Sequence, residues 1–186
     1  MFYDYLQSNV EALLFAAGEP LSSEKIAAIL QIESETVQHL LDLLAENYAQ
    51  AERGLCIRCV AGGYQLTTKP EMEATVRQLV AKQELKLTNA ALETLAIVAF
   101  KQPVTRSEME AIRGVQVDGV VNTLLDCGLI EEAGRKNTLG RPILYATSDT
   151  FLVTFGLNSL QDLPQLSAEQ LFNADNLKTD TNNTEC

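Results

Sequence analysis

The chain has 186 residues, of which 46% are hydrophobic, and a formal net charge of −11 at pH 7. This length holds one ordinary domain or two small ones, and the hydrophobic content argues against a chain that is disordered throughout. No apolar run approaches the ~20 residues that a membrane span needs, and the start, MFYDYLQSNV, lacks the basic and then apolar pattern of a secretory signal, so we expect a cytoplasmic protein.

The first half of the chain predicts three helices, a β-hairpin and a fourth helix. In chain order, these elements are expected at residues 5–18, 21–30, 34–51, 54–68 and 70–81. Apolar residues recur at helical spacing in the helices and alternate with other residues in the hairpin. Ser22 and Ser34 are the expected N-caps, Gly62–Gly63 is the expected hairpin turn, and Pro70 is expected in the first turn of the last helix.

The second half predicts the same order of three helices and a hairpin, followed by a short closing helix. The elements are expected at residues 88–102, 105–114, 117–128, 129–135 with 141–147, and 148–156. Thr105 and Glu108 have the spacing of a capping box, and Gly114 is expected to end that helix. Ser148 and Gly156 are expected to begin and end the closing helix.

An internal repeat relates the two halves at an offset of 83 residues. The equivalent pairs are Leu14 and Ile97, Ala16 and Ala99, Pro20 and Pro103, Leu21 and Val104, Ser22 and Thr105, Ile26 and Met109, Ile29 and Ile112, Val37 and Val120, and Leu41 and Leu124. Because these are apolar positions, a proline and an N-cap, they indicate a shared fold and not a shared active site. Three helices followed by a hairpin is the winged-helix order, so we predict an α+β fold, mainly α with small β-hairpins, of two tandem winged-helix domains.

The expected domain boundaries follow from this repeat. Residues 1–81 form the first predicted domain, 82–87 a linker, and 88–164 the second predicted domain. Residues 165–186 are polar, acidic and nearly free of periodicity, so we expect a mostly disordered tail. Either a solubilising terminus or a segment that folds on a partner is compatible with that composition.

No pattern in the sequence predicts an enzyme, a cofactor site or a metal site. Cys56 and Cys59 form a C-x-x-C pair, but they lie in a predicted strand, where residues three apart point to opposite faces. His39 is the only histidine, and no G-x-S-x-G pattern precedes a helix, so nucleophilic catalysis lacks its usual groups. The adjacent carboxylates Glu131 and Glu132 would point to opposite sides of a strand and form no cooperating acid–base pair.

The segment GRKNTLGRPILYATSD, residues 134–149, carries Arg135, Lys136 and Arg141 within a strongly acidic chain. Its glycine spacing and its position between two strands exclude a phosphate-binding P-loop, which must join a strand to a helix. A hairpin that captures an amphipathic or acidic peptide is one interpretation, since Pro142 lacks an N–H as an edge strand permits and tyrosine and arginine are enriched at binding hot spots. A solvated turn is the other interpretation, and the residues alone leave both open.

Reading of DNA bases is disfavoured by the charge of the third helix in each repeat. In a DNA-reading winged helix this helix enters the major groove and uses basic or amide side chains on base edges. The third helices contain no lysine or arginine, and their acidic residues are Glu35, Asp42, Glu46, Asp118 and Asp126. Such charges oppose the phosphate contacts that supply most non-specific affinity, so reading of the major groove is disfavoured and only the basic hairpin could still contact a DNA backbone.

Residues 91–164 closely resemble the segregation and condensation protein B family of bacteria. The resemblance is carried, in order, by ALETLAIVAFKQPVTR, IRGV, DGV, LIEEAGR, GRPILY, FL…FGL and SLQDLP. Residues 1–81 resemble the amino-terminal winged helix of that family more loosely, through the overall pattern and EALLFAAGEPLS. Cys127 in LLDCGLI and the turn NTLGRP depart from the usual pattern of the family.

The resemblance implies a non-enzymatic, cofactor-free accessory subunit of the bacterial condensin complex, which acts in chromosome condensation and segregation and is associated with the nucleoid. It implies a homodimer formed by the first domains, and a second domain that binds the kleisin subunit, segregation and condensation protein A. The kleisin in turn bridges the head ATPases of a structural-maintenance-of-chromosomes (SMC) protein, so contact with chromosomal DNA is indirect. The candidate partner-binding residues are Arg106, Arg113, Arg135, Lys136, Arg141, Pro142 and Tyr145. The alternative is a winged-helix transcription regulator.

Overall fold

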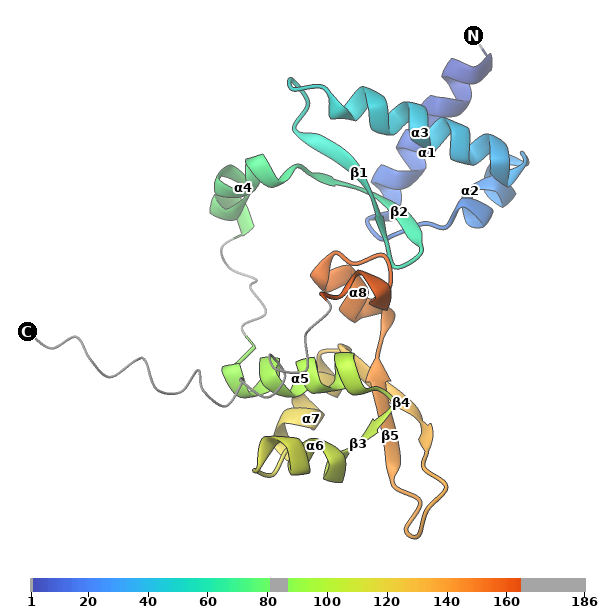
Figure 1. The fold of residues 1–186 in the computed structure, drawn as a ribbon. Coiled ribbons are helices and arrows are strands. Elements are labelled where there is room, and N and C mark those ends of the chain that lie inside the picture. Colours follow the sequence, from blue (N-terminus) through green and yellow to red (C-terminus); the bar gives the residue numbers. More distant parts are fainter. Residues whose placement is uncertain (1, 81–86, 165–186) are drawn as a thin grey trace, which may run out of the picture.

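The computed structural model describes residues 2–80 and 87–164, which form two winged-helix domains in tandem (Figure 1). The fold class is the predicted one, mainly helical with small antiparallel sheets. The expected linker at 82–87, apart from Leu87, and the expected acidic tail at 165–186 lie outside the described residues.

The first domain has the expected order of elements. They are α1 (Phe2–Ala17), α2 (Ser23–Leu30), α3 (Ser34–Ala49), β1 (Leu55–Val60), β2 (Gly63–Thr68), the 3₁₀ helix η1 (Pro70–Met72) and α4 (Glu73–Val80). The two strands pair antiparallel, and Val60 lies opposite Gly63 at the tip. The hairpin turn is therefore Ala61–Gly62 and not Gly62–Gly63, because a two-residue turn of this kind needs positive φ at both positions, and φ is 49° at Ala61 and 72° at Gly62.

The helix starts in the first domain confirm one expected cap and correct another. The Ser22 side chain accepts a hydrogen bond from the Lys25 amide at 3.3 Å, as predicted. The prediction that Ser34 caps α3 is wrong, because Glu33 holds the N-cap position and its carbonyl accepts the first helical bond, from the Val37 amide at 3.1 Å. Ser34 is thus already helical.

The second domain adds one strand to the same plan. Its elements are α5 (Asn89–Lys101), β3 (Val104–Thr105), α6 (Arg106–Arg113), α7 (Asp118–Asp126), β4 (Ile130–Arg135), β5 (Ile143–Thr147), α8 (Asp149–Phe155) and the 3₁₀ helix η2 (Leu160–Asp162). The strand order is β3-β5-β4, with Val104 opposite Tyr145 and Thr105 opposite Leu144. The strand after Pro142 is therefore the central strand of its sheet, and the expectation of an edge strand there is wrong.

The predicted caps of the second domain are confirmed. Thr105 and Glu108 form both bonds of a capping box at the start of α6, and Gly114 ends that helix in the left-handed conformation with φ of 70°. Ser148 caps α8, and Gly156 ends it with φ of 65°.

Each domain has its own hydrophobic core. The first core consists of Leu6, Val10, Leu14, Leu21, Ile26, Ala27, Val37, Leu40, Leu41 and Leu44. The second consists of Ala91, Leu95, Val98, Ala99, Val104, Met109, Val117, Val121, Leu124, Leu129, Ile130, Tyr145 and Phe151. The repeat pairs Ile26 with Met109 and Leu41 with Leu124 are core positions in both domains. The repeat pair Ile29 and Ile112 is exposed in both domains and belongs to neither core.

Candidate partner-binding surfaces

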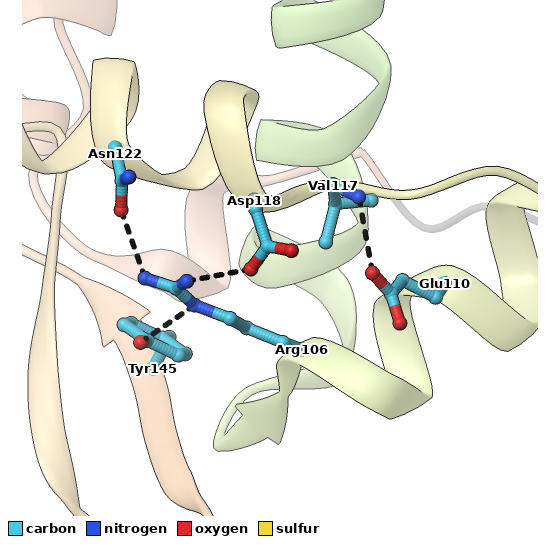
Figure 2. A network of polar contacts seen from close by, with 6 residues as sticks. All are labelled: Arg106, Glu110, Val117, Asp118, Asn122 and Tyr145. Atoms are coloured by element: carbon cyan, nitrogen blue, oxygen red, sulfur yellow. Dashed lines mark hydrogen bonds and ion pairs between the residues drawn. The ribbon is translucent and has the colours of Figure 1, made fainter.

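Arg106, the first residue of α6, joins three elements of the second domain (Figure 2). Its Nη1 lies 2.7 Å from Asp118 Oδ1, and its Nη2 donates to Asn122 Oδ1 at 2.9 Å, so both terminal nitrogens bind the exposed side of α7. Its Nε donates to the Tyr145 hydroxyl at 3.0 Å. The guanidinium is therefore occupied by its own domain, which connects α6, α7 and β5.

Tyr145 belongs to the core and not to the surface. It is 1% exposed, and it lies in the central strand β5 opposite Val104. A buried tyrosine hydroxyl needs a hydrogen-bond partner, which Arg106 supplies from the rim of the core. Tyr145 is a predicted partner-binding residue, but the structure buries its ring among core side chains, with the Arg106 guanidinium 5.5 Å from the ring centroid.

Arg113, the last residue of α6, is also bound within the domain. Its Nη1 donates to the Ala90 carbonyl and to Thr94 Oγ1, both at 2.7 Å, and its Nη2 lies 2.9 Å from Glu93 Oε2. Only 13% of its side chain is exposed. Arg113 therefore holds the end of α6 against the start of α5.

The start of α7 depends on a carboxylate from α6. Val117 holds the N-cap position and has no side-chain oxygen to cap with, and its amide donates to Glu110 Oε1 at 3.2 Å (Figure 2). This tertiary bond satisfies one of the amides that a helix start leaves unpaired.

Lys136 ties the loop of the second wing to α6. Its Nζ lies 2.5 Å from Glu108 Oε1, while Glu108 Oε2 accepts hydrogen bonds from the Thr105 amide and hydroxyl at 2.8 Å. The bond from Lys136, together with those from Thr105, lowers the pKa of Glu108 from 4.5 to about 2. Glu108 thus offsets part of the positive charge of Lys136, although 44% of the lysine side chain remains exposed.

The tip of the second wing carries a basic and apolar surface that its own domain leaves open. Leu139 is fully exposed, and Arg135 and Arg141 flank it at the ends of the loop. Arg135 donates only to the Arg141 carbonyl, at 3.2 Å, and within residues 2–80 and 87–164 the Arg141 guanidinium has no bonding partner. Pro142, at the base of the loop, accepts a bond from the Lys136 amide at 2.8 Å.

Of the seven predicted partner-binding residues, the structure therefore brings Arg106 and Tyr145 together inside the domain and places Arg113 at a helix junction. It leaves Arg135 and Arg141 available at the wing tip. Sequence reasoning missed Leu139, for which the signal was a large apolar residue in the middle of the polar turn NTLG.

The first domain exposes an apolar stripe on α1. Tyr5 is 67% exposed and Phe15 is 77% exposed. The exposed Ala12 lies between them along the helix, and the exposed Ala16 follows Phe15. The opposite side of α1 is buried in the first core. We call Tyr5, Ala12, Phe15 and Ala16 the α1 stripe. Sequence reasoning missed it, although aromatic residues off the core stripe were a readable signal.

The third helices present acidic surfaces, as predicted. In α7 the exposed residues include Asp118 and Asp126, and in α3 they include Glu35, Asp42 and Glu46. Neither helix contains a lysine or arginine of its own, and Arg106 of α6 pairs with Asp118.

The part of the chain that the structure describes contains no cluster of three or more His, Cys, Asp or Glu side chains able to hold a metal ion. No helix among residues 2–80 and 87–164 is long and apolar enough to cross a membrane.

One protein family matches this chain along most of its length. The family model of the segregation and condensation complex subunit ScpB matches residues 8–166. Segregation and condensation protein B of Moorella thermoacetica is 53% identical over 165 residues, which are 89% of this chain and 85% of the relative. The protein of the same name from Symbiobacterium thermophilum is 44% identical over 91% of this chain and 77% of the relative.

Two solved structures are similar in sequence over most of their own length. ScpB from Mycobacterium tuberculosis is 36% identical over 83% of this chain and 97% of that chain, with a TM-score of 0.41. A dimer of an ScpB N-terminal domain complexed with an ScpA peptide is 32% identical over 43% of this chain and all of that chain, with a TM-score of 0.42. Both TM-scores lie below 0.5, so the similarity to these two proteins rests on sequence identity.

Proposed function

The chain belongs to the family of the segregation and condensation complex subunit ScpB, and from this membership we propose that it is a non-enzymatic subunit of the bacterial condensin complex, acting in chromosome condensation and segregation. It dimerises and binds the kleisin subunit, which bridges the SMC ATPase heads. In this role it is associated with the nucleoid and contacts DNA only through its partners.

The dimer forms through the α1 stripe. Two aromatic side chains, Tyr5 and Phe15, expose most of their surface to water on a helix whose other side is already buried. Burying apolar surface on a second copy stabilises association in proportion to the area removed from water, and the small alanine side chains of the stripe allow two helices to approach closely.

The second wing contributes to the capture of the kleisin. The observation that carries this proposal is the combination of a fully exposed Leu139 with two arginines, Arg135 and Arg141, whose guanidinium groups meet no carboxylate among the described residues. A short amphipathic segment with acidic residues beside an apolar one matches this surface in charge and in hydrophobicity. Arg106, Arg113 and Tyr145 act indirectly, because they hold the wing and its helices in place.

A DNA-reading function is less well supported. The third helix of a DNA reader must approach phosphates, and both third helices here expose acidic side chains. We expect the isolated protein to bind duplex DNA weakly at physiological salt, which a fluorescence anisotropy titration measures. Tight binding to one DNA sequence would favour the regulator instead, whereas co-purification with the kleisin tests the condensin role.

A further inference from the structure

The tip of the first wing is bonded to the second domain. The Ala61 amide donates to the Leu157 carbonyl at 2.9 Å, and the Gly62 amide donates to Asn158 Oδ1 at 2.9 Å. The Cys59 thiol donates to the same Asn158 oxygen at 3.1 Å. Figure 1 shows the tip of the β1–β2 hairpin beside α8. Cys59 and Asn158, which meet here, are 99 positions apart in the chain.

Arg58 extends this contact along the same segment. Its Nη2 donates to the Gly156 carbonyl at 3.2 Å. The fit is close at this point, because a Cβ added to Gly156 would lie 3.1 Å from Nη2 of Arg58. Val60, the last residue of β1, is buried although it stands at a hairpin tip, and among the described residues it belongs to neither hydrophobic core.

The receiving segment, residues 156–162, is held in shape by its own domain. Asp162 Oδ2 accepts bonds from the amides of Asn158 and Ser159, both at 2.9 Å. Leu157 and Leu163 pack against the second core. The backbone of the segment, which includes the Gly156 and Leu157 carbonyls that the first wing contacts, is therefore held by contacts within the second domain.

The state of the Cys59 thiol agrees with this geometry. Partial burial, together with the nearby Asp162 carboxylate, raises the pKa of Cys59. The sulfur accordingly keeps its proton at neutral pH and acts as a donor to the Asn158 oxygen.

We propose that residues 58–62 and 156–162 form a reversible latch that holds the two winged-helix domains in one arrangement. When the latch is closed, the amides of Ala61 and Gly62 and the Arg58 guanidinium bind the second domain, so the first wing tip is withheld from other partners. The contacts between the two segments are hydrogen bonds of largely exposed groups, for which water competes, and interfaces between domains of one chain resemble transient ones. The latch therefore opens without unfolding either domain. The second wing differs, because its tip is exposed even while the latch is closed.

A disulfide trap tests the closed state in the full chain. Asn158→Cys is combined with serine at positions 56, 127 and 186, so that Cys59 is the only other thiol. Mild oxidation with diamide is expected to join the two cysteines within one chain in most molecules, because Cys59 Sγ already lies 3.1 Å from the Asn158 side chain. The product runs faster on a non-reducing gel, and peptide mass spectrometry identifies the bond.

Gln161→Cys in the same background is the matched control, since Gln161 is an exposed residue of the same segment and bonds within it, to Ser159. It is expected to cross-link to Cys59 much less. Equal cross-linking by the two variants, or a disulfide formed only between two copies, would overturn the intramolecular latch.

Hydrogen exchange tests the opening without oxidation. Asn158→Ala removes the acceptor of the Gly62 amide, and we expect several-fold faster exchange in a peptide that covers residues 59–62. Asn122→Ala, which removes an exposed asparagine from α7 in the same domain, is expected to leave this peptide unchanged. Fast and equal exchange in all three proteins would mean that the tip is not held, which contradicts the latch.

Discussion

Lys136 Nζ lies 2.5 Å from Glu108 Oε1, and this ion pair fixes the second wing to the first turn of α6. Glu108 also closes the capping box with Thr105, so one carboxylate serves both the helix start and the wing. The loop that carries Leu139 is therefore anchored at its base and free at its tip.

This pair makes the stability of the second domain depend on pH. The pKa of Glu108 is lowered from 4.5 to about 2, so its stabilising contribution is fully present above pH 4.5 and is lost as the pH falls toward 2. Lys136→Met should lower the free energy of unfolding by ~0.5–1 kcal/mol at pH 6, a small value because both side chains are over 40% exposed. Urea denaturation at pH 6 and pH 3 should show a smaller difference from wild type at pH 3.

Arg135→Met is the control for that experiment. Arg135 is a cation of the same wing, but it donates to a carbonyl and has no carboxylate partner among the described residues. Its effect should be the same at both pH values. A pH-independent effect of Lys136→Met would contradict the ion pair with Glu108.

Tyr145→Phe separates a core role from a partner-binding role. The variant keeps the buried ring and removes the hydroxyl that accepts a hydrogen bond from Arg106 Nε. The free energy of unfolding should therefore fall by ~0.5–1.5 kcal/mol. Thermal or urea denaturation measures this change, and capture of the kleisin by the folded protein should be unaffected. Unchanged stability together with weaker capture of the kleisin would mean that Tyr145 takes part in partner binding.

The α1 stripe is tested by charge. Tyr5→Glu with Phe15→Glu should raise the dimer dissociation constant by at least ~tenfold, because two charged groups would have to be desolvated at the interface. Light scattering over a concentration series measures the mass. Ile29→Glu, an exposed apolar position on α2, is the control and should remain dimeric. If the double variant dimerises like wild type, the α1 stripe is not the dimer interface.

The wing tip is tested by charge reversal. Arg141→Glu with Arg135→Glu should weaken kleisin binding at least ~tenfold while changing the free energy of unfolding by less than ~0.5 kcal/mol, because both side chains are exposed. Titration against a labelled kleisin segment measures the binding. Arg77→Glu, which reverses an exposed cation of α4 in the first domain, should bind like wild type. Equal binding by all three proteins would show that the tip is only a solvated turn.

The fold was largely predictable because its signals are local. The caps Ser22 and Thr105 occupy equivalent positions of the repeat, and both start the second helix of their domain. Helical spacing and turn residues likewise located the helices and both hairpins to within a few residues. Glu33 was missed as a cap because its role depends on the backbone alone, through its carbonyl.

The candidate site was less predictable because its contacts join distant parts of the chain. The two-residue strand β3 is too short to show a period, and it makes β5 a central strand. The first domain has the counterpart of this pairing in the bridge between Leu21 and Tyr64, which local patterns also do not reveal. Cations such as Arg106 look alike in sequence whether they bind a carboxylate of their own domain or remain available to a partner.

The central claim is that the chain is a dimeric subunit that binds the kleisin. The most direct measurement is the mass, by light scattering coupled to size exclusion, of the full chain purified together with the kleisin subunit. The account predicts one complex that contains two copies of this chain and the kleisin. Separate elution of the two proteins at micromolar concentration, with this chain at the mass of one copy, would contradict it.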